Sequence, residues 1–220
     1  SAMKFAKMAE AELRQIPGTN EIKLTMKKIV TAFLFLSAFG FAQEKTTRNV
    51  GDFTTVKVFD KISVQLIEAS ETKVELSGIR SSDVELVNKN GELKIRMPFP
   101  KLLKGEEVTA IVYYKRLEGV EASEGAYVSS PGTFNAIAFD VNAKEGAEIR
   151  LTLDAKRATV KASSGAVVRL TGKAQNQDIV VSSGAIVKAS SLEGEQTVVV
   201  VNAGGEADVY ATELVEAKTR

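Results

Sequence analysis

Three basic residues recur at equal intervals in the second half of the sequence. They are Arg150, Arg169 and Lys188, and each comes four residues after a glycine. If the fold brings them together, they can bind carboxylate or phosphate groups through charge-assisted hydrogen bonds. That chemistry suits an anionic polysaccharide or a lipid headgroup. The same residues also suit a structural role, as solvated charges that keep a β surface soluble, with Glu148 relieving part of their repulsion.

A second recurring set is small and polar, and it lies two residues before the same kind of glycine. Such residues either form an edge that hydrogen-bonds sugars or cap turns through local bonds to the backbone. Both interpretations are open at this stage. The set consists of Ser123, Ser163, Ser182 and Asn202.

Composition excludes much other chemistry. The chain has no histidine and no cysteine, which excludes disulfides, Ser-His-Asp triads and the usual zinc ligands. A formal net charge of +1 and 6% aromatic residues argue against a nucleic-acid partner. Neither a calcium-binding spacing of acids nor a phosphate-binding glycine loop is present. We therefore expect no cofactor and no metal site.

An enzyme that acts on polysaccharides is the main alternative to a binding protein. Glycoside hydrolysis needs two carboxyl groups roughly 5 to 9.5 Å apart. The acidic residues of the second half are scattered, and the repeat gives no reason for two of them to share a cleft. A non-catalytic role is therefore favoured over a polysaccharide lyase or hydrolase. The acids considered are Asp140, Glu145, Glu148, Asp154 and Asp178.

The elements that position the basic residues form an internal repeat. Its glycines recur at nearly equal intervals of about 20 residues, a regularity typical of solenoids. β-Branched residues follow the first four glycines by three residues and precede all five by five residues, with small residues at intermediate offsets. The repeated positions are Gly125, Gly146, Gly165, Gly184 and Gly204; then Val128, Ile149, Val168 and Val187; and Val120, Val141, Val160, Ile179 and Val199.

This pattern predicts an all-β fold, a single-chain parallel β-helix with coils of about 20 residues and a β-rich N-terminal part. Each repeat is interpreted as two short alternating strands joined at a glycine corner, and stacking the copies satisfies strand edges and buries like residues in columns. Antiparallel hairpins are the structural alternative. A leucine-rich repeat is excluded because its leucine ladder is missing. Strands expected before the repeat are 54–58, 63–67, 73–76, 84–87, 93–97 and 108–114.

An apolar segment between the last two of these strands has two interpretations. Met97, Phe99, Leu102 and Leu103 either form a loop packed over an end of the solenoid or provide an exposed contact site for a partner.

The N-terminal region has the pattern of a targeting signal. Residues 26–42 contain Met26-Lys27-Lys28, an apolar run from Ile29 to Phe41 and small residues before a cleavage site after Ala42. The run is shorter than the roughly 20 residues of a membrane anchor. We therefore predict a signal peptide at 26–42, a tag or upstream segment at 1–25 outside the fold, and a mature domain at 43–220. The protein would be exported to the periplasm, the outer membrane surface or the cell exterior, with no transmembrane anchor in the mature chain.

Across residues 47–218 the sequence resembles the auto-transporter adhesin head GIN domain family of Bacteroidetes and related bacteria. The resemblance lies in the signal peptide, in the opening 50–58 (VGDFTTVKV), in 62–67 (ISVQLI) and 91–95 (GELKI), and in the repeated Ser-Gly-Ala segments. It implies a secreted β-solenoid with an adhesive, non-catalytic role and brings no catalytic residues with it. Glycans or surface proteins are the expected partners.

The C-terminal end departs from the family pattern. Family members typically continue beyond the segment that resembles 208–211, whereas this sequence stops at Arg220. A missing final coil or cap would expose a sheet edge and part of the core. We therefore also expect a second alternative, a structural module that assembles end to end into homo-oligomers.

Overall fold

Strands make up most of the chain that the computed structural model describes, residues 45–219. Thirteen strands belong to one sheet, and two short 3₁₀ helices, η2 (Ser81–Asp83) and η3 (Phe99–Lys101), lie between strands of the first half. The segments assigned to an upstream region and a signal peptide, 1–42, lie outside the described residues. The strands of the first half are β1 (Thr46–Asn49), β2 (Thr55–Val58), β3 (Ser63–Glu68), β4 (Lys73–Ser77), β5 (Glu85–Lys89), β6 (Glu92–Arg96), β7 (Thr109–Tyr114) and β8 (Gly119–Ala122).

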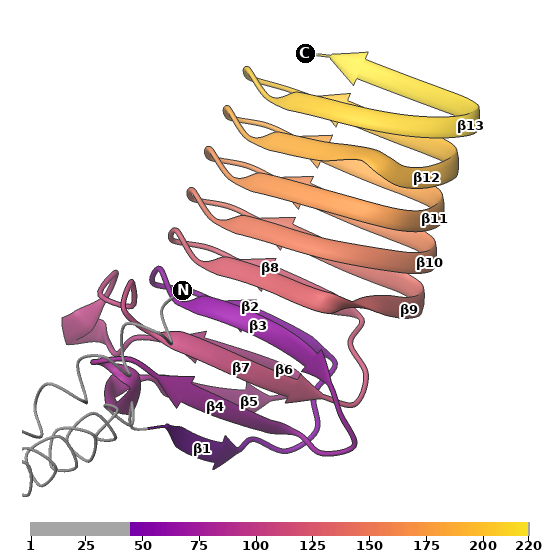
Figure 1. The fold of residues 1–220 in the computed structure, drawn as a ribbon. Helices are drawn as coiled ribbons and strands as arrows, with labels where there is room; N and C mark the ends of the chain where they lie inside the picture. Colours follow the sequence, from indigo (N-terminus) through magenta and orange to yellow (C-terminus); the bar gives the residue numbers. More distant parts are fainter. Residues whose placement is uncertain (1–44, 220) are drawn as a thin grey trace, which may run out of the picture. The chain divides into compact units, whose positions relative to one another are not determined.

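The second half is a stack of parallel coils. Five long strands pair with one another in sequence order, and each of the first four runs from one glycine corner to the next (Figure 1). The predicted parallel β-helix, built from coils of the length of the sequence repeat, is confirmed. The strands are β9 (Tyr127–Ala143), β10 (Glu148–Ala162), β11 (Val167–Val181), β12 (Ile186–Val201) and β13 (Glu206–Thr219).

Alternating polarity explains how one strand builds a whole coil. Buried and outward-facing residues alternate along β10, except where Lys156 and Arg157 are both exposed. Two successive outward residues require the chain to bend back, because side chains in a strand otherwise alternate between faces. Each coil therefore has two flat faces, joined by a tight glycine corner on one side and a bend within the strand on the other.

Columns of apolar residues fill the space between the two faces. Val128, Ile149, Val168 and Val187 pair in register on successive strands, and all four are buried. Full burial of such a side chain contributes about 1.5–3 kcal/mol. The predicted stacking of the repeat positions is thus confirmed. The opposite face supplies a matching column of Val141, Val160, Ile179 and Val199.

The corners are tighter than the glycine pattern alone indicates. Ser164 and Gly165 both have positive φ, at 53° and 73°, and the N–H of Ala166 donates to the carbonyl of Ser163 at 3.2 Å. Two successive residues with positive φ are typical of the type I′ turn. The N–H of Gly165 also donates to the carbonyl of Ser183 on the next corner, at 3.1 Å, so the corners form a hydrogen-bonded ladder of their own.

Replacing Ser164 by asparagine should stabilise the solenoid. Asn-Gly is a preferred type I′ sequence, whereas serine is less suited to positive φ. We expect the S164N variant to gain about 0.5–1 kcal/mol in the free energy of unfolding, measured by urea denaturation. The matched variant Gly165→Ala should lose stability, since alanine disfavours φ of 73°. A loss of stability in S164N would contradict the expectation.

A bulge in β9 explains the longest glycine interval. Ser129 pairs with Arg150 and Thr133 pairs with Thr152, so four residue steps on β9 match two steps on β10. Pro131 lies within this bulge, where a residue without an N–H group does not break a regular ladder. The two additional residues make the interval from Gly125 to Gly146 longer than the intervals that follow.

β12 carries a smaller bulge at the same place on its coil. Lys188 pairs with Arg169 and Ser191 pairs with Thr171, so three steps on β12 match two on β11. The single additional residue accounts for the slightly longer interval between Gly184 and Gly204. The irregular intervals are therefore local insertions on one face, and the register of the inward columns is kept.

The N-terminal part differs from a simple continuation of the solenoid. β2 and β3 form a coil that pairs in parallel with β8 and β9 on one side and with β6 and β7 on the other, so these coils are not stacked in sequence order. β1, β4 and β5 pair antiparallel with their neighbours. The predicted β-rich N-terminal part is therefore confirmed, and its antiparallel strands close this end of the solenoid.

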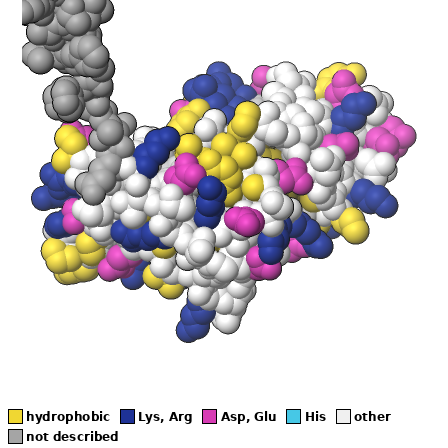
Figure 2. All heavy atoms as spheres, turned by 60° about the horizontal axis from the view of Figure 1, so that its bottom comes forward, with side chains coloured by type: hydrophobic (Ala, Val, Ile, Leu, Met, Phe, Trp, Pro, Cys, Tyr) yellow, Lys and Arg dark blue, Asp and Glu magenta, His cyan; other side chains and the backbone are white. Residues whose placement is uncertain are grey.

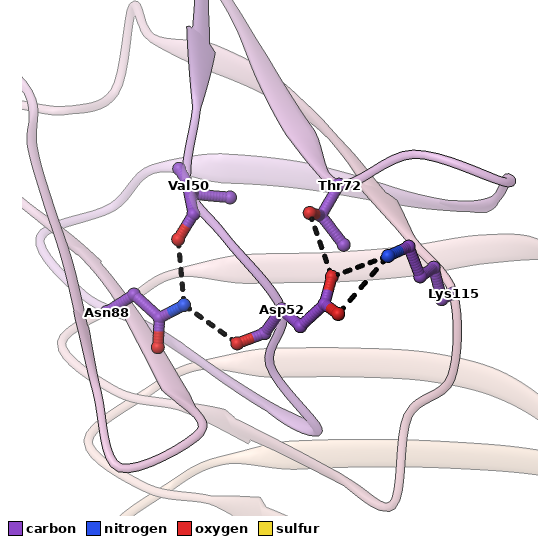
Figure 3. Close-up of polar contacts among 5 residues, drawn as sticks. All are labelled: Val50, Asp52, Thr72, Asn88 and Lys115. Atoms are coloured by element: carbon purple, nitrogen blue, oxygen red, sulfur yellow. Dashed lines mark hydrogen bonds and ion pairs between the residues drawn. The ribbon is translucent and has the colours of Figure 1, made fainter.

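Polar contacts hold the segment between β1 and β2 against this closed end (Figure 3). The side-chain amide of Asn88 donates to the carbonyls of Val50 and Asp52, at 2.7 and 2.9 Å. Lys115 Nζ lies 2.8 Å from the Asp52 carboxylate, which also accepts a bond from the Thr72 hydroxyl. The hydrogen bond from Lys115 lowers the pKa of Asp52 below its ordinary value. The segment 50–58, which opens the resemblance to the family, therefore has a structural role: its first residues are held against the N-terminal end of the solenoid.

The last strand has fewer neighbours. β13 pairs only with β12 in the described part of the chain. Tyr210, Leu214 and Val215 on β13 are about half exposed. Assembly through this edge stays a prediction.

Candidate functional site

The three basic residues that recur in the second half of the sequence lie in one column. Arg150 pairs in register with Arg169, and Arg169 pairs with Lys188. Neighbouring strands in a sheet are about 4.8 Å apart, so the three cations follow one another along the solenoid axis at that interval. Their side chains point outward from β10, β11 and β12. We call Arg150, Arg169 and Lys188 the cationic column.

Glu148 holds two members of this column in place. Its carboxylate accepts hydrogen bonds from the Nε atoms of Arg150 at 2.7 Å and of Arg169 at 3.2 Å. Burial would raise the pKa of Glu148, but these two bonds bring it below the ordinary value. The Arg150 guanidinium also lies over the Tyr127 ring, 5.7 Å from its centroid. The predicted relief of repulsion by Glu148 is therefore present as two direct bonds.

A column of hydroxyl groups runs beside the cationic column. Thr133, Thr152, Thr171 and Ser191 pair in register on β9 to β12, and the hydroxyls of Thr152 and Thr171 are 2.9 Å apart. We call these four residues the hydroxyl column. Sequence analysis missed them because the bulges of β9 and β12 shift Thr133 and Ser191 away from a constant offset from the glycine.

The small polar residues before the corners have a different environment. Ser123 is buried, and its hydroxyl bonds to the Glu145 carboxylate on the next corner. The side-chain oxygen of Asn202 is buried as well. Burial at these two positions does not suit a sugar-binding edge, which needs accessible groups. The turn-capping interpretation is not supported there either, because the Ser123 hydroxyl bonds to a carboxylate and the Asn202 side-chain oxygen has no hydrogen-bond partner in residues 45–219.

Three of the grooves formed by residues 45–219 lie elsewhere on the molecule, and one of the three gathers several carboxylates. This groove of about 430 Å³ lies over Gly119, and Lys57 lies 2.8 Å from Glu92 and 3.6 Å from Glu121. The bond from Lys57 lowers the pKa of Glu92, whereas a general acid for glycoside cleavage needs a raised pKa. The groove is also lined by Glu118, Asp140 and Lys161.

The other two grooves lie at opposite sides of the coils. One of about 540 Å³ follows the bends and includes Asp154, Lys173 and Glu193. One of about 550 Å³ lies against the corners, beside Leu102 and Leu103. In residues 45–219 no group of three or more acidic residues is arranged to hold a metal ion. No helix within the same residues is long and apolar enough to span a membrane.

The family is decided by a match to almost the whole described chain. The model of the family described as "Putative auto-transporter adhesin, head GIN domain" matches residues 52–220. The chain belongs to this adhesin family. None of the curated proteins compared with it matches.

Solved structures share the fold of this adhesin-family chain. A "putative adhesin" from Bacteroides fragilis is 15% identical with a TM-score of 0.74, covering 82% of this chain and 86% of the other. A "putative adhesin" from Parabacteroides distasonis is 17% identical with a TM-score of 0.63, covering 81% and 87%. A "putative lipid binding protein" from the same species is 11% identical with a TM-score of 0.59, covering 80% and 85%.

Each of the two interpretations, a packed cap and an exposed contact site, fits a different part of the apolar segment between β6 and β7. Met97 is buried in the core, as a cap residue would be. Phe99 is 86% exposed, and Leu102 and Leu103 are about half exposed. The adhesin-family fold therefore uses one end of this segment for packing and leaves the other in contact with solvent.

Acidic residues meet at the corners nearest to this segment. Burial, and then the charge of the neighbouring Asp60, raise the pKa of Glu124. A raised pKa means that ionised Glu124 costs stability, so its contribution is most favourable below the ordinary pKa and is lost as the pH rises through the raised value. We expect Glu124→Gln to be more stable than the natural sequence at pH 7. The difference should vanish below about pH 4 in thermal unfolding experiments. Equal stability at pH 7 would contradict this.

Proposed function

We propose that this adhesin-family protein is a non-catalytic binding module of the cell surface or the secreted fraction, whose ligands are glycans or surface proteins. The observation that carries the proposal is the rigid outward array on β9 to β12. There the parallel register repeats the members of each column at the strand spacing, and the cationic column and the hydroxyl column lie side by side. Membership of the adhesin family supports the same role. Export through a signal peptide at 26–42 is part of the proposal.

Binding of the full-length chain to arrays of bacterial and host surface glycans, and to surface proteins, tests the proposal. We expect saturable binding with the bound glycan released unchanged. An absence of binding to every ligand would overturn the role. Cleavage of a bound glycan would instead support the alternative, a carbohydrate-active enzyme.

Light scattering at several concentrations tests the other alternative, end-to-end assembly. The binding module needs no self-association, so a constant monomer mass is expected. A mass that grows with concentration would favour the structural module.

A further inference from the structure

The cationic column is exceptional among the outward columns of its face. Like charges directly opposite each other on neighbouring strands destabilise a sheet. The column of Asp154, Lys173 and Glu193, which lies beyond the hydroxyl column, avoids this by alternating charge, and Lys173 lies 3.9 Å from Glu193. On β10 to β12, only Arg150, Arg169 and Lys188 place the same charge on all three strands. Figure 2 shows the same mixing of signs over the end of the molecule that it displays.

We propose that the cationic column and the hydroxyl column together bind a linear anionic polysaccharide whose chain runs along the solenoid axis. This inference rests on the proposed binding function and names its ligand class. A local arrangement that costs stability is expected at a functional site rather than on an ordinary surface. Glu148 bonds to Arg150 and Arg169, and Asp208 on β13 pairs in register with Lys188, so acidic groups of the ligand would relieve the repulsion that remains.

Glu148 positions the guanidinium groups of Arg150 and Arg169 for such a ligand. Both of its hydrogen bonds are to Nε atoms, those of Arg150 and Arg169. The Nη atoms of these two arginines have no hydrogen-bond partner within residues 45–219. Two Nη groups present a planar set of donors that matches a carboxylate or sulfate. Fixing the arginines before binding lowers the entropy lost when the ligand docks.

The hydroxyl column lies along one side of the cationic column and adds hydrogen-bonding groups to the proposed binding surface. Thr152 and Thr171 each lie two residues beyond an arginine, which is about 6.6 Å along an extended strand. Their hydroxyls both donate and accept hydrogen bonds, as sugar hydroxyls require. The two columns therefore offer charge to acidic groups and hydrogen bonds to ring hydroxyls on each of β10, β11 and β12. Three cations span about 10 Å, so several linked sugars are needed to engage all of them.

Two triple variants with the same change in net charge test the proposal. The first, R150T, R169T and K188T, removes the cationic column. The second, K156T, R157T and K173T, removes three cations on the bend side of the coils. Binding of the full-length chain to polygalacturonate, to dextran sulfate and to neutral dextran is measured by isothermal titration calorimetry.

We expect the first variant to lose about tenfold or more in affinity for polygalacturonate or dextran sulfate, and the second to lose less than about twofold. Binding should weaken as salt rises, and dextran should not bind. The pair T152V and T171V should weaken binding without changing charge. Removing the repulsion should stabilise the first variant, whereas losing the two bonds to Glu148 should destabilise it, so thermal unfolding is measured to verify that the variant is folded.

Equal losses in the two triple variants, or equal binding of dextran, would overturn the inference. Binding to other ligands of the array without any binding to the two polyanions would also overturn it, while the proposed function would stand. Phospholipid vesicles are included, and binding to vesicles alone would identify a lipid headgroup as the ligand and overturn the polysaccharide. No binding to any ligand would end both proposals.

Discussion

Replacing Gly172 by alanine is expected to destabilise the solenoid by about 3 kcal/mol or more. Gly172 lies in β11 with φ of 100°, where residues with a side chain are strained. A Cβ atom at this position would lie 2.1 Å from the carbonyl oxygen of Leu153 on β10. The obstacle is backbone within a hydrogen-bonded ladder, so the strands would have to separate. Urea denaturation of the two proteins measures the loss.

The corner variant Gly165→Ala is the matched control. Gly165 also has positive φ, but nothing lies within 4 Å of a Cβ atom there. Its loss should therefore reflect backbone conformation alone, about 1–2 kcal/mol. If G172A loses no more stability than G165A, the close approach of Gly172 to the backbone of Leu153 does not determine the loss.

Replacing Asp60 by alanine should cost about 3 kcal/mol, the second largest effect that we expect. Asp60 is 1% exposed, and its carboxylate accepts the backbone N–H groups of Met97 at 2.9 Å and Leu103 at 2.8 Å. Without it, two donors of the segment between β6 and β7 lose their acceptor. We expect lower thermal stability and faster proteolytic cleavage near Leu103.

Two further variants separate the causes. Asp60→Asn keeps one acceptor oxygen and tolerates the positive φ of this corner, so it should lose less than D60A. Asp83→Ala removes an ion pair between Asp83 and Lys101, 2.8 Å apart, which holds the same segment at the surface. Such a pair contributes about 1 kcal/mol or less. A loss in D83A equal to that in D60A would show that burial of the carboxylate is not decisive.

Periodicity was sufficient to predict the parallel solenoid. Ile149 and Val168 recur at a constant offset from a glycine. Stacking is the arrangement that buries both side chains and satisfies the backbone hydrogen bonds of their strands. The same offset places Arg150 beside Arg169, so the cationic column followed from the sequence once the register was assumed. In a repeated sequence the contacts between coils can be predicted, because each residue contacts the equivalent residue of the next coil.

Elements outside the repeat depended on tertiary contacts. The coil of β2 and β3 lies between coils that come later in the chain, and only packing selects that order. Asp60 has no repeated partner, and the donors to its carboxylate come from the segment between β6 and β7, 37 and 43 residues away. The hydroxyl column was hidden for a related reason, since bulges in β9 and β12 shift Thr133 and Ser191 relative to their glycines.

The sequence by itself therefore determined the all-β class, the stacked coils and the cationic column, because these depend on residues that repeat along the chain. The tertiary structure alone decided how the N-terminal end is closed, that Gly172 allows two strands to approach, and that Glu148 holds both arginines through their Nε atoms. These features depend on the distances between atoms that are remote in sequence, and no local pattern of residue types records such distances.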